Sequence, residues 1–274
     1  MKTLWTLVIV LALAYAALVL FVYVFQSRLL YFPQVGREVS ITPQRIGLTF
    51  EDVWLKSAPD VDIHGWYVPH PNAKGTVLFF HGNAGSIALR LDWLRMFHDL
   101  GYAVLIIDYR GYGRSAGSPT EGGTYEDATA AWTYLTQVRG TAPRDIVIVG
   151  ESLGGAVAAE LAARTTPRAV ILQSTFTSIP TLAGEIYRFL PVRWISRHEY
   201  DTRARIQRIS APILIAHSPG DEIIPYRHGR ELFERAGEPK HFIELHGGHN
   251  GGFLFGRPAW VSEVGIWLQR FERG

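Results

Sequence analysis

Short apolar stretches alternate with helical segments along most of the chain, and this alternation limits the possible folds more than any other feature. Two β-type stretches at 52–56 and 63–68 precede the strongly apolar stretch Thr76–Phe80. Beyond it, stretches typical of buried strands take turns with stretches of helical periodicity. Strands that alternate with helices predict an α/β fold, in which helices cover both faces of a mostly parallel sheet. Further strands are predicted at 103–107, 145–149, 169–172, 213–216 and 242–245, and helices at 87–100, 125–138, 153–164, 227–236 and 260–271.

The length and charge of the chain indicate one large domain without a nucleic-acid partner. A sheet of this class fits into a single domain, which we predict over residues 46–274. The 27 basic and 25 acidic residues leave a net charge of +2 and form no basic block of the kind that follows phosphates. Because the chain has no cysteine, disulfides and cysteine-ligated metals are excluded, whereas both reducing and oxidising compartments are compatible with it.

An uncharged apolar run of 22 residues, 4–25, precedes the alternating part of the chain. About 20 helical residues cross the hydrocarbon core of a bilayer, so we predict a single-pass transmembrane anchor over residues 1–26. Trp5 and Tyr23, near the two ends of the run, fit the interfacial positions that such rings prefer. Residues 27–45 mix aromatic, Pro, Gly and charged residues without a period and are predicted to connect the anchor to the domain.

A cleaved signal peptide is the alternative interpretation of the N-terminal run. Lys2 and the small-residue site at 14–16 are typical of such peptides. Cleavage there would leave the apolar stretch 18–25 exposed on the mature protein, which favours the uncleaved anchor. Lys2 on one side nearly balances Arg28 and Arg37 on the other, so the basic residues indicate no side of the membrane for the domain.

Residues 174–200 interrupt the alternation, with Pro180, Pro191 and several aromatic side chains. We predict a small lid over a site here, and an ordinary long connection remains the open alternative. The aromatic candidates for the lid are Phe176, Tyr187, Phe189 and Trp194.

The pattern Gly-x-Ser-x-Gly occurs twice, at 150–154 and at 113–117. A nucleophilic serine on a sharp turn between a strand and a helix needs Gly on both sides to avoid steric clashes. Ser152 directly follows an apolar strand and directly precedes an Ala-rich helix, whereas Ser115 lies in a Gly- and Pro-rich loop where no helix can begin at once. We therefore predict Ser152 as the nucleophile, the alternative being a serine that only caps a helix.

Two backbone amides are candidates for stabilising negative charge next to Ser152. The N–H of Leu153 lies at the start of the predicted helix, where free amide groups favour an anion. The second donor is expected from the loop after the first central strand, and we predict the N–H of Asn83 in the Gly-rich stretch 81–85. His81, at the end of that strand, is predicted to be structural and not a catalytic base.

A serine nucleophile needs a histidine to remove its proton and a carboxylate to orient that histidine. In folds with this turn, the three residues occur along the chain in the order serine, acid, histidine. Asp221 lies in the loop 217–222, which follows the strand predicted at 213–216 at the carboxyl edge of the sheet. We predict Asp221 as the acid. Glu222 is its rival, although the sequence at 223–225 indicates that the chain turns inward after Asp221.

The base must come after the acid, which leaves four of the ten histidines. We predict His249, because its Gly-rich loop 247–252 past the last strand can deliver an imidazole to the serine. His246 is the runner-up, while His228 falls in a helix and His241 starts a strand. Glu244, His246 and His249 match no standard zinc spacing, so we predict no metal and no cofactor.

Together these motifs resemble the membrane-anchored branch of the α/β-hydrolase superfamily, the ABHD-type (alpha/beta-hydrolase-domain) serine hydrolases. The resemblance covers most of the predicted domain and implies the α/β-hydrolase fold, with Ser152, Asp221 and His249 as a catalytic triad. It also implies that the copy at 113–117 is a structural loop. The motifs that carry it are Ser-Arg-Leu-Leu-Tyr-Phe-Pro at 27–33, His-Gly-Asn-Ala-Gly at 81–85, Asp-Tyr-Arg-Gly-Tyr-Gly at 108–113, Gly-Glu-Ser-Leu-Gly at 150–154, Pro-Gly-Asp at 219–221 and Gly-Gly-His-Asn at 247–250.

The resemblance implies hydrolysis of a carboxylic ester or thioester through an acyl-enzyme, without fixing the substrate. Members or relatives of the family are linked to esters, lysophospholipids, acyl thioesters and sometimes peptides. The predicted anchor and the aromatic lid candidates favour a small or lipid-like acyl substrate. A serine peptidase or amidase, acyl transfer to an alcohol and a catalytically silent scaffold are the alternatives, and the intact set of site residues argues against the scaffold.

Overall fold

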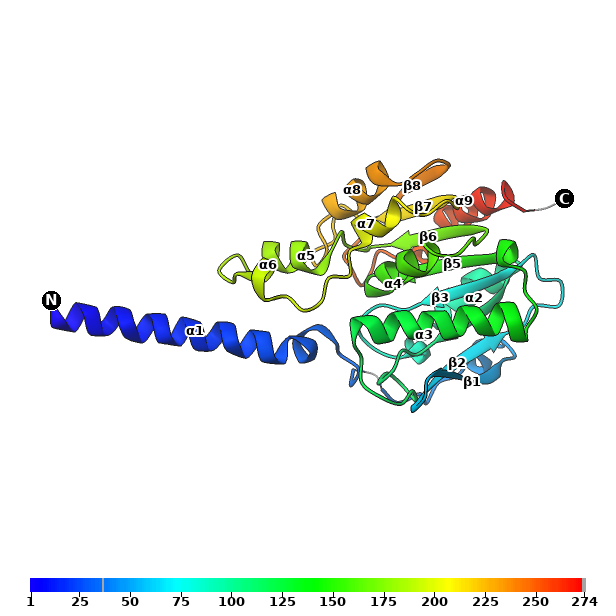
Figure 1. Ribbon diagram of the computed structural model, residues 1–274. Helices are drawn as coiled ribbons and strands as arrows, with labels where there is room; N and C mark the ends of the chain where they lie inside the picture. Colours follow the sequence, from blue (N-terminus) through cyan, green and yellow to red (C-terminus); the bar gives the residue numbers. More distant parts are fainter. Residues whose placement is uncertain (36, 273–274) are drawn as a thin grey trace.

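The computed structural model describes residues 1–35 and 37–272, and it contains one eight-stranded sheet in the order β1-β2-β4-β3-β5-β6-β7-β8 (Figure 1). β1 pairs with β2 and β2 with β4 in antiparallel fashion, while all the other pairs are parallel. Residue 36 of the predicted connecting segment and residues 273–274 of the predicted domain lie outside the described residues. The strands are β1 (Glu51–Ala58), β2 (Val61–Val68), β3 (Thr76–Phe80), β4 (Ala103–Ile107), β5 (Ile146–Glu151), β6 (Ala169–Gln173), β7 (Ile213–His217) and β8 (Lys240–Glu244).

Helices cover both faces of this sheet, as the alternation predicted. Successive residues of a strand point to opposite faces, so Leu78 and Phe80 of β3 join one apolar core and Val77 and Phe79 join the other. Side chains of α3, α4, α7 and α8 complete the first core, and those of α2 and α9 complete the second. The helices are α1 (Lys2–Leu30), α2 (Leu91–Asp99), α3 (Glu121–Thr133), α4 (Leu153–Ala162), α5 (Ile179–Ile186), α6 (Val192–Ile195), α7 (Thr202–Ile206), α8 (Arg227–Arg235) and α9 (Pro258–Gln269).

The α/β fold, the mostly parallel sheet and the two helical layers are therefore confirmed, whereas some element boundaries differ and the short helix α7 was not predicted. β5 runs two residues beyond its predicted end, because Gly150 and Glu151 still pair with β6. The helix predicted at 87–100 is a 3₁₀ turn (Ile87–Leu89) followed by α2, since Arg90 has a non-helical backbone between them. α7 was not predicted, because five residues are too few to establish a helical period.

α1 projects from the domain as a 29-residue helix with a mean hydropathy of 2.9 over its most apolar window, and none of that window is buried. Among the described residues it is the one helix long and apolar enough to cross a membrane. It ends at Leu30, four residues after the predicted end of the anchor at residue 26. Polar Gln26 and Ser27 do not end the helix; instead the backbone turns extended at Tyr31, just before Phe32-Pro33.

The segment 174–200 contains the short helices α5 and α6 (Figure 1), and it contacts α1 through Phe189, between these helices, and through Ile195 of α6. The hydroxyl of Tyr15 donates to the carbonyl of Phe189 at 2.7 Å, and the amide of Gln26 donates to the carbonyl of Ile195 at 3.1 Å. Phe176 was wrongly expected among exposed lid aromatics: it is buried in the core beneath the sheet edge, with 3% of its surface exposed.

A buried chain of hydroxyl groups fixes the end of α1 to the domain. The hydroxyls of Tyr31 and Tyr200 lie 2.8 Å apart, and the Tyr200 hydroxyl lies 2.9 Å from that of Thr124 in α3. Tyr200 is fully buried and Tyr31 nearly so. Buried hydroxyls that satisfy one another cost little, but each becomes expensive when its partner is removed. The junction between α1 and the domain is therefore a packed, hydrogen-bonded contact and not a free tether.

We expect Tyr200→Phe to lower the free energy of unfolding by about 1–3 kcal/mol, because the buried hydroxyls of Tyr31 and Thr124 lose their shared partner. Urea unfolding of the full chain in detergent micelles measures this. Tyr187→Phe is the matched control, since the Tyr187 side chain is half exposed and its hydroxyl makes no hydrogen bond within residues 1–35 and 37–272. Equal stability of the two variants would contradict the assignment.

Candidate active site

Ser152 lies on a sharp turn between β5 and α4, with backbone angles of φ 54° and ψ −117°. A positive φ is unusual for a residue with a side chain and stores strain, which persists only where the surroundings enforce it. Here the two flanking glycines make the turn possible. A Cβ on Gly150 would lie 2.3 Å from the carbonyl oxygen of Gly154, and one on Gly154 would lie 2.1 Å from the carbonyl oxygen of Phe80. The sequence pattern thus reflects backbone segments that pass too close for any side chain.

The three residues predicted as a triad meet at the carboxyl edge of the sheet. Nε2 of His249 lies 3.1 Å from Oγ of Ser152, and Nδ1 of the same ring lies 2.8 Å from Oδ2 of Asp221. Ser152 follows β5, Asp221 lies in the loop after β7, and His249 lies in the loop after β8. Ser152 and His249 are partly accessible to solvent, whereas the carboxylate of Asp221 is buried.

The surroundings of Asp221 keep its carboxylate ionised. Burial alone would raise the pKa of Asp221, but hydrogen bonds from His217 and His249 and from the N–H of Ile224 outweigh it and hold that pKa well below its usual range. The N–H groups of Ile223 and Ile224 both donate to Oδ1, at 3.0 and 2.7 Å. An ionised Asp221 accepts the proton on Nδ1 of His249, which leaves Nε2 free to accept the proton of Ser152.

The competing candidates for acid and base have other contacts. Glu222 does not approach the imidazole of His249, but its Oε2 accepts the backbone N–H of that residue at 3.0 Å and so holds the loop. The ring of His246 stacks on Trp260, with centroids 5.9 Å apart, and Glu244 accepts the hydroxyl of Tyr226. The structure therefore does not gather Glu244, His246 and His249 into the ligand set of a metal.

The two predicted amide donors have no hydrogen-bond acceptor within the part of the chain that the structure describes. Among the described residues, the N–H groups of Asn83 and Leu153 donate no hydrogen bond. Leu153 directly follows Ser152 at the start of α4, where helix amides have no intrahelical partner. The adjoining loop is also close, because a Cβ on Gly82 would lie 3.4 Å from Cβ of Ser152.

The side chain of Asn83 is held from two sides. Its Oδ1 accepts the hydroxyl of Tyr112 at 2.9 Å, and its Nδ2 donates to the carbonyl of Leu30, the last residue of α1. Phe32 and Ala84 form an isolated parallel bridge alongside. The end of the N-terminal helix thus touches the loop that carries a predicted amide donor, a contact that no motif in the sequence indicates.

A buried ion pair next to the nucleophile was also missed by sequence reasoning. Oε2 of Glu151 lies 3.0 Å from Nε of Arg90 and accepts the indole N–H of Trp93 at 3.2 Å. Glu151 is the residue directly before Ser152 in the Gly-x-Ser-x-Gly pattern, and its carboxylate lies beside Gly82. The ion pair joins the start of α2 to the turn between β5 and α4. Only the burial of a charged residue between strand and nucleophile could have pointed to it.

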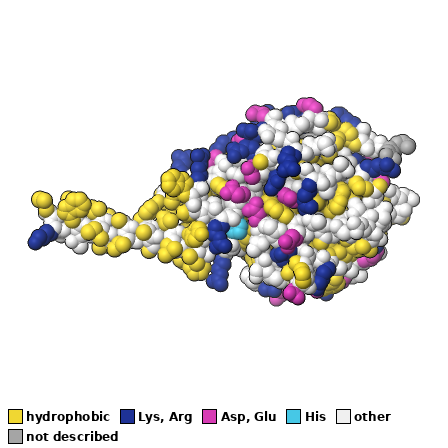
Figure 2. All heavy atoms as spheres, in the orientation of Figure 1, with side chains coloured by type: hydrophobic (Ala, Val, Ile, Leu, Met, Phe, Trp, Pro, Cys, Tyr) yellow, Lys and Arg dark blue, Asp and Glu magenta, His cyan; other side chains and the backbone are white. Residues whose placement is uncertain are grey.

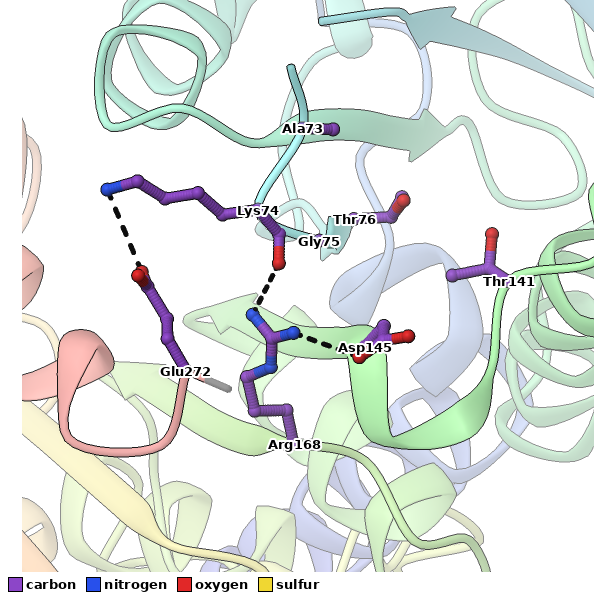
Figure 3. Close-up of a pocket in the computed structure, with 8 residues that line it drawn as sticks. All are labelled: Ala73, Lys74, Gly75, Thr76, Thr141, Asp145, Arg168 and Glu272. Atoms are coloured by element: carbon purple, nitrogen blue, oxygen red, sulfur yellow. Dashed lines mark hydrogen bonds and ion pairs between the residues drawn. The ribbon is translucent and has the colours of Figure 1, made fainter. Parts of the chain in front are cut away.

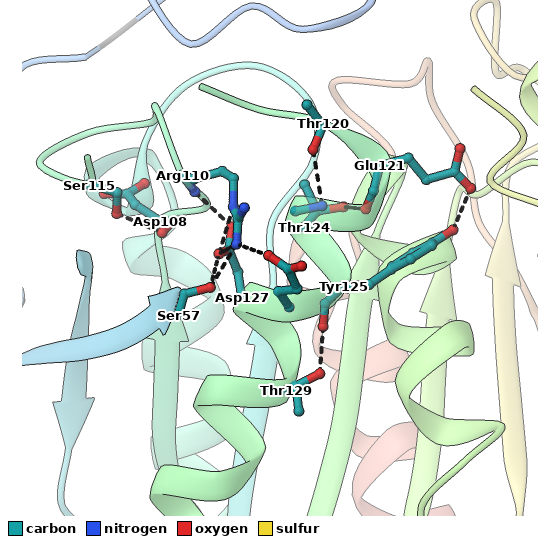
Figure 4. Close-up of polar contacts among 12 residues, drawn as sticks. Ser57, Asp108, Arg110, Ser115, Thr120, Glu121, Thr124, Tyr125, Asp127 and Thr129 are labelled. Carbon is teal, nitrogen blue, oxygen red and sulfur yellow. Dashed lines mark hydrogen bonds and ion pairs between the residues drawn. The ribbon is translucent and has the colours of Figure 1, made fainter. Parts of the chain in front are cut away.

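The second Gly-x-Ser-x-Gly copy is a structural loop. Ser115 is buried, and its hydroxyl donates to the carbonyl of Asp108 at 2.7 Å and accepts the N–H of His64 at 2.8 Å. Figure 4 shows Ser115 and Asp108 beside the network in which the Arg110 side chain and N–H bind Asp127 of α3 at 2.8–3.0 Å. His81 is likewise buried, with Nδ1 2.7 Å from the carbonyl oxygen of Gly82.

A cavity of about 390 Å³ lies at the opposite, amino edge of the sheet, where β3, β5 and β6 begin. Figure 3 shows that its charged side chains already bind one another. Arg168 donates to the carbonyl of Lys74 at 2.8 Å and to Asp145 at 3.0 Å, and Nζ of Lys74 lies 3.8 Å from Glu272. This cavity therefore has no chemical connection to Ser152.

Comparison with known proteins agrees with this architecture. Residues 75–197 match the family model described as alpha/beta hydrolase fold. An uncharacterised protein of Mycobacterium tuberculosis is 35% identical over 246 residues, covering 89% of this chain and 87% of that one. The alpha/beta hydrolase domain-containing protein WAV2 of Arabidopsis thaliana is 36% identical over 233 residues, covering 77% and 76%.

Among solved structures, an esterase of Pyrococcus furiosus has the same fold, with a TM-score of 0.71 at 20% identity over 85% of this chain and 94% of that one. The likeness at this identity concerns the fold, whereas the sequence relatives establish the family. The chain belongs to the α/β-hydrolase family, among its alpha/beta-hydrolase-domain (ABHD-type) proteins.

Proposed function

We propose that this protein is a serine hydrolase that cleaves a carboxylic ester or thioester through an acyl-enzyme intermediate. Ser152 is the nucleophile, His249 the general base and Asp221 the orienting acid. The observation that carries the proposal is the continuous chain of contacts from Asp221 through His249 to Ser152, at 2.8 and 3.1 Å. Family membership and the strained backbone of Ser152 support the same roles.

In the first half of the reaction, Oγ of Ser152 attacks the acyl carbon while Nε2 of His249 takes the hydroxyl proton. The charge that develops on the carbonyl oxygen is stabilised by the N–H groups of Asn83 and Leu153 as an oxyanion hole. His249 then returns the proton to the leaving alcohol or thiol as the carbon–oxygen or carbon–sulfur bond breaks. The acyl group remains on Ser152 as an ester.

In the second half, His249 removes a proton from a water molecule, which attacks the acyl carbon. The bond to Oγ breaks, and Oγ recovers its proton from His249, so the products are a carboxylic acid and the regenerated serine. The ionised Asp221 stabilises the imidazolium that forms in each half and keeps the ring in the required tautomer. No step requires a metal or a cofactor.

We further propose that α1 anchors the protein in a membrane as a single pass, with residues 46–274 as the catalytic domain and 174–200 as a small lid. The length and mean hydropathy of α1 support the anchor. The segment that contacts α1 carries half-exposed or exposed aromatic side chains at Tyr187, Phe189 and Trp194, which favours a lipid-like acyl substrate over a strongly polar one.

Labelling with a fluorophosphonate probe tests the nucleophile independently of the substrate. We expect the wild type and Ser115→Ala to be labelled and Ser152→Ala to remain unlabelled, because the hydroxyl of Ser115 is buried in two hydrogen bonds. Ser115 is the matched control, since it lies in the same Gly-x-Ser-x-Gly pattern. Absence of label on cooperatively folded wild type would instead favour a catalytically silent scaffold.

The proposed role of Asp221 predicts a loss of activity when its carboxylate is replaced by an amide. Asp221→Asn should lower kcat by about 10⁴-fold, because the amide favours the wrong tautomer of His249. Glu222→Gln, the matched control, should retain most activity, since Glu222 contacts only the backbone of His249. A loss in Glu222→Gln as large as that in Asp221→Asn would reassign the acid.

The same variant tests the lowered pKa of Asp221 through stability. A carboxyl whose pKa is lower in the folded than in the unfolded state stabilises the fold fully above its unfolded value, about 3.9. This contribution is lost as the pH falls below that value towards the folded pKa. The stability advantage of wild type over Asp221→Asn should therefore be constant from pH 7 to about 5 and shrink below about pH 4. An advantage that grows on acidification would contradict the lowered pKa.

The substrate class is tested by comparing p-nitrophenyl esters of increasing acyl length with the p-nitroanilides of the same acids. We expect turnover of the esters, with kcat/KM rising with acyl length, because the aromatic lid favours apolar chains. Faster cleavage of the anilides would instead support a peptidase or amidase.

A further inference from the structure

Residues 186–197 form the tip of the α5–α6 segment and present an apolar surface to the outside of the protein. Ile186, Tyr187 and Phe189 are each about half exposed or more, and Trp194 is 90% exposed. A single exposed apolar residue is common on soluble proteins, but several large exposed apolar side chains within one short segment are typical of an interaction surface. Figure 2 shows apolar side chains along α1 that continue onto the adjoining end of the domain.

The tip is fixed against α1 at a point well inside the apolar run. Tyr15, which donates its hydroxyl to the carbonyl of Phe189 at 2.7 Å, is near the middle of that run. Further along, Gln26 binds Ile195, and the guanidinium of Arg197 lies 5.8 Å from the ring centre of Tyr23. The segment therefore runs alongside α1 for about 16 Å, from Gln26 back to Tyr15, at a rise of about 1.5 Å per residue.

The length of the apolar run determines whether the tip lies in water or within the hydrocarbon of the bilayer. Residues 4–14 provide about 16 Å of helix, roughly half of the 30 Å hydrocarbon core. A helix that crosses the membrane must therefore continue past Tyr15 within the hydrocarbon, to about Val22 or Tyr23. Phe189, which is held beside Tyr15, then lies about 10 Å below the end of the hydrocarbon at residues 22–23, in the leaflet on the side of the domain.

The polar groups of the tip fit this depth. Non-helical backbone is tolerated at membrane depth where it packs against protein, and this segment packs against α1, where Tyr15 satisfies the carbonyl of Phe189 and Gln26 that of Ile195. The tip has no acidic residue but carries Arg188, Arg193 and Arg197, which form no ion pair within the described residues 1–35 and 37–272. Long arginine side chains can extend from apolar surroundings to lipid phosphates.

We propose that residues 186–197 insert into the lipid leaflet beside α1, with their aromatic side chains among the acyl chains and their arginines at the phosphates. The partner is thus a lipid surface. This proposal rests on the proposed anchor role of α1, and it does not depend on the catalytic role of Ser152. If the proposal holds, the tip of the predicted lid contacts the membrane and is not surrounded by water.

The absence of cysteine allows a direct test in the full chain, reconstituted in lipid nanodiscs that expose both faces. Single substitutions Phe189→Cys and Trp194→Cys carry an environment-sensitive fluorophore. Leu11→Cys in α1 is the positive control, and Val138→Cys is the aqueous control because Val138 is 70% exposed at the far end of α3 and its π-helical extension (Tyr134–Val138). Each labelled protein is first checked for cooperative unfolding.

We expect the labels at 189, 194 and 11 to be quenched several-fold more strongly by nitroxide on lipid acyl chains than by aqueous iodide, and the label at 138 to show the reverse. If 189 and 194 behave like 138 while 11 is quenched from the lipid, the proposal is overturned and the anchor stands. If 11 also behaves like 138, both the anchor and the insertion are overturned. Fluorophosphonate labelling of Ser152 in the same samples reports separately on the proposed hydrolase.

Discussion

The close approach of three backbone segments at the start of α4 is the constraint on which the site depends. Gly150, Gly154 and the carbonyl of Phe80 leave no room for a Cβ, so the chain must pass from β5 to α4 through the strained Ser152. Because β3 and β5 are neighbours in the sheet, this turn also brings the loop after β3 next to the serine. The positions of the proposed nucleophile and amide donors thus follow first from the packing of the sheet.

The positions of the proposed acid and base depend on the same sheet at longer range. β7 and β8 lie beyond β6, and their carboxyl ends release the loops of Asp221 and His249 on the same edge as Ser152. Each loop is then fixed locally: the N–H groups of Ile223 and Ile224 hold Asp221, and Glu222 holds the backbone of His249. The sheet brings the two loops to the same edge, and these few hydrogen bonds fix the exact positions of Asp221 and His249 within them.

The sequence predicted most of the fold, and it predicted which candidate site residues lie together, because both follow from local patterns. Apolar strands such as Thr76–Phe80 and Ala103–Ile107 are buried on both faces and agree with the structure residue by residue. Two copies of the Gly-x-Ser-x-Gly pattern could be distinguished because one directly follows a strand and the other does not. Contacts between distant segments could not be predicted: Asn83 with Leu30, Glu151 with Arg90, and Tyr31 with Tyr200 are pairs that no spacing reveals.

One of those long-range contacts connects the end of the N-terminal helix to the loop of the proposed oxyanion hole. Leu30 binds the side chain of Asn83, so the end of α1 and the proposed oxyanion loop share one contact. About 10 Å of helix separates Leu30 from Tyr23, where the hydrocarbon would end if α1 spans a bilayer. The carboxyl edge of the sheet then faces the membrane surface at close range. The proposed oxyanion loop, which contacts Leu30, and the tip of the α5–α6 segment, which contacts Tyr15, would then both lie on the side of the domain that faces the membrane.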